Sequence, residues 1–476
     1  MCKKSVSLWP AAVACLVTAF PVHAATDGER ISALEDQLRQ QQRAMDAMSI
    51  ELSRLKAGEP PLASPRLATM AVTAEHVGAA AEDISDPAPQ VDKQLTATIY
   101  GFVQADTIYD FKRVDPDWED TLRVTTIPTQ KGLYGNNGDV IFSVRQSRLG
   151  VKGNYGEDIT YNLEGELFGV GSDQGQTTLR VRQAWATYKN FGMGQTWSNF
   201  MDIDIFPNTI DYWGPTGMVF YRNKQARYSF PLNDGVFSLS LEDPNTAFSI
   251  GQFRNTDGCD LPNPSPDCAS SDSTAEDIFQ SYNDIPDLTG RYRRSGDFGH
   301  FQVAGIARKL GYERLDNGGK DYKLGWGINA SAALNTWGPD NLMLQVVYGE
   351  GIGNYMNDGG LDLVPDSADL LLAEAETVPL LGIVSYYDHF WNERWASSIG
   401  WSMIDLDNGA GQAETEFKRG QIATVNLLHY PADHVLLGTE ISWGQRENIN
   451  GAVGSDYRVQ FSLKVDFDTE NLMQRK

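Results

Sequence analysis

The fold is decided by residues 192–230, GMGQTWSNFMDIDIFPNTIDYWGPTGMVFYRNKQARYSF. Both ends of this stretch have the pattern of strands, whereas the middle contains prolines and glycines, including Pro207 and Gly214, which cannot continue a strand ladder. The middle also holds aromatic residues that need packing partners and acids that need water or cations. A loop folded back into a polar lumen satisfies both needs, and a loop on the outer surface satisfies only the acids. We therefore predict that residues 197–217 form the constriction of a pore. The constriction candidates are Asp202, Asp204, Pro207, Asp211 and Gly214.

Side chains alternate with a period of two from residue 94 onward, as in strands with one apolar and one polar face. In one of the clearest segments, Leu163 and Leu167 share a face, and Glu164 and Glu166 share the other. A neighbouring segment places Leu179, Val181 and Trp185 opposite Arg180 and Arg182. This alternation, repeated along the chain, indicates a sheet with an apolar outside and a wet inside.

The connections between these segments alternate in length. Short turns follow one set of strand ends, and long loops follow the other, at 111–139, 197–217, 242–286 and 351–376. Short turns at one end and long loops at the other are typical of outer-membrane β-barrels. We predict an all-β fold, a 16-stranded antiparallel transmembrane β-barrel over residues 94–467, with 468–476 as a C-terminal tail; the alternative counts differ by one hairpin. The predicted strands are 95–109, 140–152, 158–168, 178–189, 191–196, 218–230, 235–251, 287–294, 299–311, 320–335, 340–350, 377–388, 393–404, 416–430, 434–446 and 456–467.

The N-terminal part differs from the rest in pattern. Residues 1–24 have the basic start, apolar middle and small-residue end of a signal peptide. Residues 29–57 have apolar residues spaced by three and four, which favours an α-helical coiled coil over an amphipathic helix lying on the barrel or the membrane. Residues 58–93 are rich in Ala and Pro and are predicted to be a linker. The seam residues of the coiled coil are Ile31, Leu34, Leu38, Met45, Met48, Leu52 and Leu55.

The composition excludes several classes of function. A net charge of −24 argues against nucleic acid as a partner, since phosphate binding needs a basic surface. The chain has no HExxH, CxxC or GxSxG motif and no phosphate-binding glycine loop, so we expect no enzyme, no cofactor and no metal site. Cys259 and Cys268 flank a short polar stretch, and we expect a disulfide between them in an exported protein.

Inward-facing arginines are the candidates for a function. An anion in a narrow pore loses part of its hydration, so fixed positive charge favours its passage. Arginine stays ionised and holds a carboxylate through two parallel hydrogen bonds. The strand alternation, and for Arg222 the junction of loop and wall, indicates six pore-lining candidates: Arg148, Arg182, Arg222, Arg227, Arg291 and Arg293. The alternative is that these arginines pair with Glu164, Glu166 and the loop acids and only hold the loop in place.

Two further observations qualify this set. Arg145 has the opposite parity from Arg148, which indicates a bulge or a wrong register at that point. Arg180 and Arg308 are weaker candidates for the pore wall.

Several motifs resemble those of a known family. They are GQTW at 194–197 with FMD at 200–202, PNT at 207–209, GP at 214–215, Arg222 with QARY at 225–228, and PDL at 286–288 with RYR at 291–293. Together with the N-terminal pattern, they resemble the DcaP-like trimeric porins of Gram-negative outer membranes. The resemblance implies a 16-stranded homotrimer with a periplasmic N-terminal coiled coil. It also implies passive uptake of small anionic solutes such as dicarboxylates through an arginine-lined constriction.

Three functions remain open from the sequence. The first is a porin for small, preferably anionic solutes, seated in outer-membrane lipid. The second is a general, non-selective porin. The third is a structural outer-membrane protein whose coiled coil contacts the cell wall.

Overall fold

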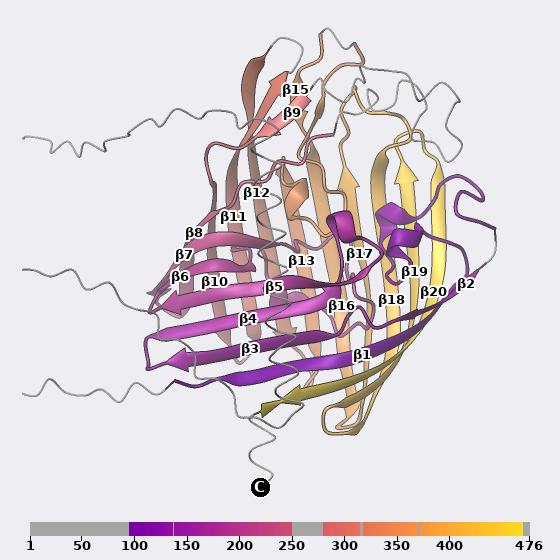
Figure 1. Ribbon diagram of the computed structural model, residues 1–476. Coiled ribbons are helices and arrows are strands. Elements are labelled where there is room, and N and C mark those ends of the chain that lie inside the picture. The colour runs from indigo at the N-terminus through magenta and orange to yellow at the C-terminus, as the bar shows by residue number, and fades with distance from the viewer. Residues whose placement is uncertain (1–94, 137, 250–278, 315–317, 370–371, 470–476) are drawn as a thin grey trace, which may run out of the picture. The chain divides into compact units, whose positions relative to one another are not determined.

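The computed structural model describes residues 95–136, 138–249, 279–314, 318–369 and 372–469, and nearly all regular structure in these ranges is strand (Figure 1). The main strands are β1 (Thr98–Asp110), β2 (Asp139–Ser143), β3 (Arg148–Tyr155), β4 (Ile159–Phe168), β5 (Thr177–Tyr188), β6 (Phe191–Trp197), β7 (Arg222–Leu232), β8 (Gly235–Glu242), β9 (Phe279–Tyr282), β10 (Asp287–Gly296), β11 (Gly299–Arg314), β12 (Gly319–Asn335), β13 (Asn341–Glu350), β16 (Pro379–Asn392), β17 (Trp395–Leu406), β18 (Phe417–Ala432), β19 (Val435–Asn448) and β20 (Val453–Asp468).

The remaining elements are short. They are the ribbon of β14 (Leu363–Pro365) and β15 (Ala375–Thr377) and the 3-10 turns η1 (Pro116–Trp118), η2 (Val124–Thr126), η3 (Gly171–Asp173), η4 (Ile203–Ile205) and η8 (Gly353–Tyr355). Among the described residues, no helix has both the length and the apolar character needed to cross a membrane.

The sheet closes on itself because β1 pairs with β20 on one side and with β3 on the other. β2 and β3 both pair with β1, and β9 and β10 both pair with β11, so each pair is one interrupted strand of the wall. Counted in this way, the wall is a closed antiparallel barrel of 16 strands, and the predicted fold and strand number are confirmed.

Two irregularities change which side chains face the lumen. The break between β2 and β3 turns Arg145 inward, where its guanidinium bonds Asp120 at 2.6 Å. The register of β4 against β5 shifts between Glu164 and Gly165. Because a bulge reverses the alternation, Trp185 lies on the same face as Arg182, against the prediction, and its ring lies 5.6 Å from the guanidinium of Arg227.

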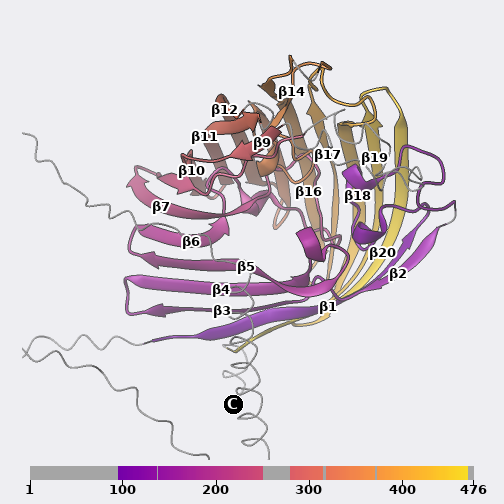
Figure 2. The same cartoon turned by 45° about the horizontal axis from the view of Figure 1, so that its top comes forward.

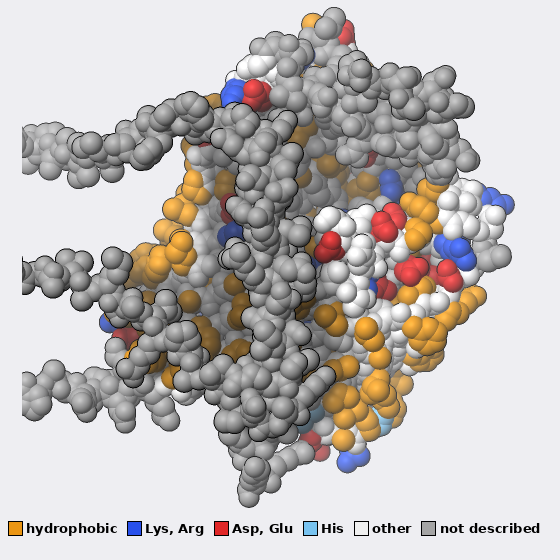
Figure 3. Space-filling view, viewed as in Figure 1, with side chains coloured by type: hydrophobic (Ala, Val, Ile, Leu, Met, Phe, Trp, Pro, Cys, Tyr) orange, Lys and Arg blue, Asp and Glu red, His pale blue; other side chains and the backbone are white. Residues whose placement is uncertain are grey.

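The outer face of the barrel is apolar and the inner face is polar. Leu163, Ile399 and Phe461 are more than half exposed, whereas the inward Glu166 and Gln460 are buried. Figure 3 shows hydrophobic side chains over the lower part of the visible wall, with charged groups gathered above them. This inside-out distribution suits a wall surrounded by lipid.

Three long connections fold into the barrel, at 111–138, 198–221 and 351–378. Their apolar residues form one core with inward residues of the wall, including Leu122, Phe200, Tyr355 and Ile404. Figure 2 shows their short turns within the ring of strands. The core of this protein therefore lies inside the barrel.

Several predictions fall outside the described residues. They concern the signal peptide, the coiled coil, the linker, the Cys259–Cys268 disulfide and all but the first two residues of the tail. These remain predictions.

A glycine substitution tests how closely the connection at 198–221 packs on the wall. A Cβ on Gly217 would lie 2.0 Å from the carbonyl oxygen of Met403 on β17. Gly217→Ala must therefore push the connection off the wall, and we expect a loss of about 1–3 kcal/mol in stability. Thermal unfolding in detergent checks this. Gly305→Ala is the control, because its nearest atom is 3.9 Å away, and equal melting of the two variants would contradict the packing.

Candidate functional site

Residues 198–221, called the inward segment below, run across the lumen between opposite parts of the wall. On the side of β4, the Tyr212 hydroxyl donates to Glu166 at 2.6 Å. On the far side, the backbone N–H groups of Ile210 and Gly217 donate to Glu440 and to the Ser402 hydroxyl, each at 2.8 Å. The segment is thus held at both walls by groups buried inside the barrel.

The three inward connections meet at Asp358. One carboxylate oxygen accepts hydrogen bonds from Arg123 and Thr125 of the first connection, both at 3.0 Å. The other accepts from Trp213 and Thr216 of the inward segment at 3.0 and 2.9 Å. One buried carboxylate therefore ties all three connections together.

Four of the arginines considered from the sequence surround Glu166. Arg180 and Arg182 bond its carboxylate directly, and Arg148 and Arg222 lie 3.7 and 3.6 Å from it. Arg182 also bonds Glu164 at 2.8 Å. Among the described residues, these four arginines share two glutamates, so the cluster carries a net positive charge while it organises the wall.

Tyr212 links this cluster to the inward segment. Its ring stacks on Phe168 at 3.8 Å between centroids. Burial and the neighbouring Glu166 raise the pKa of the Tyr212 phenol, so it stays protonated and can donate its hydrogen bond to that carboxylate. Arg180, a weaker candidate from the sequence, is positioned by the same hydroxyl.

Arg227 on β7 and Arg291 on β10 differ from the other arginines. Their strands flank β8, where Ser240 lies opposite Arg227 and Ser238 lies opposite Arg291. Arg227 donates to Gln225 and to the Trp197 carbonyl oxygen, which are neutral. Within the described residues, no carboxylate lies within 4.0 Å of either guanidinium. Glu242 attracts both groups from beyond that distance, so among the described residues the two neighbouring arginines have no carboxylate in direct contact.

Arg293 on β10 binds the acids of the inward segment. Its guanidinium lies 3.1 Å from Asp202 and 2.5 Å from Asp204. Asp202 is buried and also contacts His300 at 2.8 Å and the Ser331 hydroxyl at 2.7 Å. Arg293 and Asp202 are therefore anchors of the segment, which is the role the alternative interpretation gave them.

The other constriction candidates have distinct positions. Pro207 is buried in the segment. Asp211 accepts hydrogen bonds from the Thr121 hydroxyl and the Leu122 N–H, both at 2.9 Å, which joins the first connection to the inward segment. Gly214 has φ +71, and a Cβ there would lie 2.5 Å from the Phe206 ring, so only glycine fits.

Sequence reasoning missed several buried ion pairs. Arg458 bonds Asp110 through two contacts of 2.6 Å. Arg308 bonds Asp287 and Asp362 at 2.9 and 2.8 Å. Arg458 has inward parity between two outward apolar residues, so alternation could have found it. The first connection could also have been recognised, because Leu122, Val124 and Ile127 raise the same packing problem as the aromatic residues of the inward segment.

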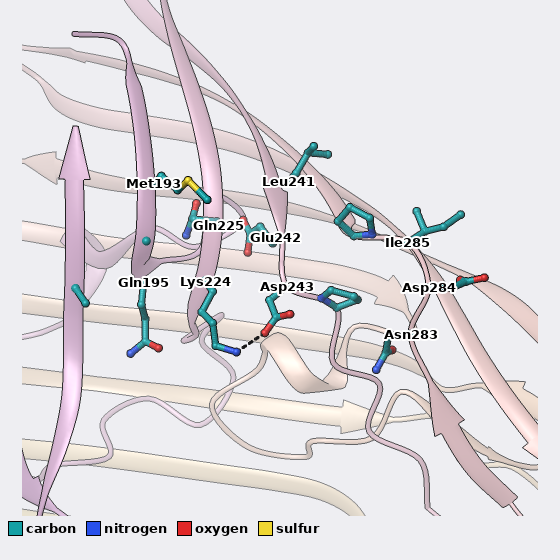
Figure 4. A pocket seen from close by; sticks show the side chains of 14 residues that line it. Met193, Gln195, Lys224, Gln225, Leu241, Glu242, Asp243, Asn283, Asp284 and Ile285 are labelled. Atoms are coloured by element: carbon teal, nitrogen blue, oxygen red, sulfur yellow. Dashed lines mark hydrogen bonds and ion pairs between the residues drawn. The ribbon is translucent and has the colours of Figure 1, made fainter. Parts of the chain in front are cut away.

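Two cavities differ in their position on the wall. One of about 470 Å³ lies in the lumen beside Arg148, Arg182 and the inward segment. Another of about 820 Å³ lies on the outer face, beside the exposed side chains of Met193 and Leu241 (Figure 4). Lys224 and Asp243 pair across that outer cavity at 2.7 Å. Only the first cavity lies where a solute inside the barrel would meet the arginines.

Comparisons with known proteins agree with this architecture. The family model of the DcaP outer membrane protein matches residues 72–239. The crystal structure of the outer membrane channel DcaP of Acinetobacter baumannii superposes with a TM-score of 0.64 at 21% identity, over 78% of this chain and 97% of that one. No curated protein matches the chain.

Two other barrels are more distant. An anion-selective porin from Comamonas acidovorans has a TM-score of 0.48 at 11% identity, over 79% of this chain and all of that one (100%). OmpT of Vibrio cholerae has a TM-score of 0.44 at 10% identity, over 78% and 98% of the two chains. The resemblance predicted from the sequence is confirmed as far as these comparisons reach: the DcaP family model matches part of the chain, and the barrel has the fold of the DcaP channel.

Proposed function

We propose that this protein is an outer-membrane porin that admits small hydrophilic solutes by passive diffusion and prefers anions. The observation that carries the proposal is the pair Arg227 and Arg291, two inward guanidinium groups without a carboxylate within 4.0 Å in the described chain. Fixed charge of one sign in a narrow lumen raises the local concentration of ions of the other sign. Carboxylates, including dicarboxylates, are the solutes that such a pair fits best.

The inward segment acts as the constriction in this proposal. It supplies one side of the passage, and the arginine-bearing wall of β3, β5, β7 and β10 supplies the other. Arg148, Arg182 and Arg222 contribute the charge that Glu164 and Glu166 leave uncompensated. These arginines thus both anchor the segment and attract solute.

The proposal extends to assembly by analogy with the family. We expect a homotrimer in outer-membrane lipid, with residues 29–57 forming a coiled coil in the periplasm and contact with the cell wall as a further role of that helix.

Asp202 is expected to make the constriction sensitive to acid. Burial alone would raise the pKa of its carboxyl, but the hydrogen bond and charge of His300, the Ser331 hydroxyl and Arg293 outweigh burial, so the pKa is lowered. A lowered pKa means that the folded state favours the ionised form. Its contribution to stability is complete above about pH 4 and is lost as the pH falls through the folded pKa.

Removing Arg227 and Arg291 tests the proposed selectivity. One unit charge at about 4 Å in water is worth about 1 kcal/mol, so we expect Arg227→Gln with Arg291→Gln to lower the chloride-to-potassium permeability ratio roughly five-fold. Reversal potentials in planar bilayers under a salt gradient measure this ratio. Arg294→Gln is the control, since Arg294 is exposed and pairs with Asp234 near a short turn. Cation preference of the unaltered protein would refute the proposal.

Neutralising Glu166 separates attraction from anchoring. Glu166→Gln leaves the surrounding arginines with less compensation, so anion preference should rise. The same change weakens the contacts of Tyr212 and Arg182, so thermal stability should fall by a few kcal/mol, roughly 3–5. Reversal potential and thermal unfolding are measured on one preparation. Unchanged selectivity with lowered stability would mean that these arginines only anchor the segment.

Acid titration tests Asp202. Asp202→Asn should be less stable than the unaltered protein at pH 7 and should lose less stability between about pH 5 and pH 2. Thermal unfolding in detergent across this range gives the two slopes. Asp204→Asn is the matched control, because Asp204 is more than half exposed. Parallel acid slopes for Asp202→Asn and the unaltered protein would contradict the assignment.

A further inference from the structure

The lumen cavity of about 470 Å³ has two unlike sides. Phe102, Arg148 and Lys464 lie on the barrel wall, from β1, β3 and β20. Phe206 and Phe220 line the cavity from the inward segment. Arg182, Glu164 and Asp211 line it as well. The part around Arg148 and Lys464 is called the cationic side below, and the part around Phe206 and Phe220 the aromatic side.

The aromatic ring of Phe102 positions both cations of the cationic side. The ammonium nitrogen of Lys464 lies 4.4 Å from the centroid of Phe102, and the guanidinium carbon of Arg148 lies 5.0 Å from it. A contact with an aromatic face positions a cation without using its hydrogen bonds. The Nε of Arg148 is buried without a hydrogen-bond partner among the described residues. The nearest oxygens of Glu164 and Glu166 lie 4.0 and 3.7 Å from the Arg148 guanidinium, which is longer than a hydrogen bond. The donors of Arg148 are therefore weakly engaged.

Lys464 is similarly available. Its one ion pair is with Asp466 at 3.1 Å, and the Asp466 side chain is 42% exposed, where water weakens the attraction. Lys464 lies opposite Leu436, close to the short turn at 433–434. The cavity is therefore placed toward the short-turn end of the barrel.

The aromatic side is a row of three rings. Phe220 lies 5.1 Å from Trp197 and 5.6 Å from Phe206, centroid to centroid. All three are only partly buried, although the same segment buries Phe200 and Ile205 completely. Covering exposed apolar surface is favourable, so this row favours an occupant with a hydrocarbon part.

We propose that this cavity binds small organic monocarboxylates on their way through the barrel. The carboxylate lies between Arg148 and Lys464, and the hydrocarbon part lies against Phe206 and Phe220. One pair of weakly engaged cations matches one carboxylate, and the row of rings matches the hydrocarbon part. The inference rests on the proposed function. It names a solute class for a second binding site, separate from Arg227 and Arg291.

Chain length and charge provide the test. In planar bilayers, block of the chloride current is measured with propionate, hexanoate and succinate added on each side in turn. Hexanoate should bind about eight-fold more tightly than propionate, since each added methylene is expected to contribute roughly two-fold on a partly buried surface. Hexanoate should block the chloride current at a lower concentration when it is added on the short-turn side of the barrel than when it is added on the other side. Equal block by propionate and hexanoate would overturn the proposal.

Substitutions locate the site. Lys464→Gln should weaken hexanoate block about five- to ten-fold, and Phe206→Gln should remove the advantage of hexanoate over propionate while leaving propionate unchanged. Lys224→Gln, on the outer face, is the control. Unchanged hexanoate block in both variants would place the site elsewhere and refute the proposal.

The reversal potential, recorded in the same bilayers, separates the two ideas. Cation preference of the unaltered protein refutes the proposed function itself. Anion preference without an effect of hydrocarbon chain length on block refutes only the monocarboxylate binding site.

Discussion

The carboxylate of Glu166 is the contact on which the arrangement of the lumen depends. It is fully buried, receives Arg180 and Arg182 from the wall, and accepts the hydroxyl of Tyr212 from the inward segment. Removing one partner of a buried charge network leaves the others uncompensated at a cost of several kcal/mol. A single acid therefore both orders the basic wall and fastens the segment that faces it.

The closed wall makes this arrangement possible. The wall of the barrel is a single layer of strands with an apolar outer face, so it does not form a core by itself. Connections that fold into the lumen supply the core. Three of them meet at Asp358, and their backbone donors find buried acceptors such as Glu440 and Ser402. Each buried donor needs such a partner, which explains why so many acids face the lumen.

Much of the fold could be predicted because alternation is a local property of the chain. Every one of the 16 wall strands overlaps a predicted segment. Only at the bulge beside Trp185 and at the break at Arg145 does a side chain face the other side of the wall than alternation predicts. Loop length identified which connections are long. It could not show that residues 111–138 and 351–378 also fold inward, because that depends on partners distant in the sequence.

The ion pairs of the candidate arginines could not be predicted. Parity, and for Arg222 the junction of loop and wall, predicted that six arginines face the lumen. That they line a path for solutes stays a prediction. Which of them keep a free charge depends on distances to acids on other strands and on the inward segment. Among the described residues, Arg293 contacts Asp202 and Asp204 directly, whereas Arg227 and Arg291 contact no carboxylate, and no pattern in the sequence distinguishes them.

The proposed anion preference requires that Arg227 and Arg291, which contact no carboxylate among the described residues, attract anions in the lumen. Bromide soaked into crystals of the protein measures this directly, since its anomalous signal marks where anions collect. The account predicts a bromide peak within hydrogen-bonding distance of both guanidinium groups. Bromide bound only at outward lysines, with none at this pair, would contradict it.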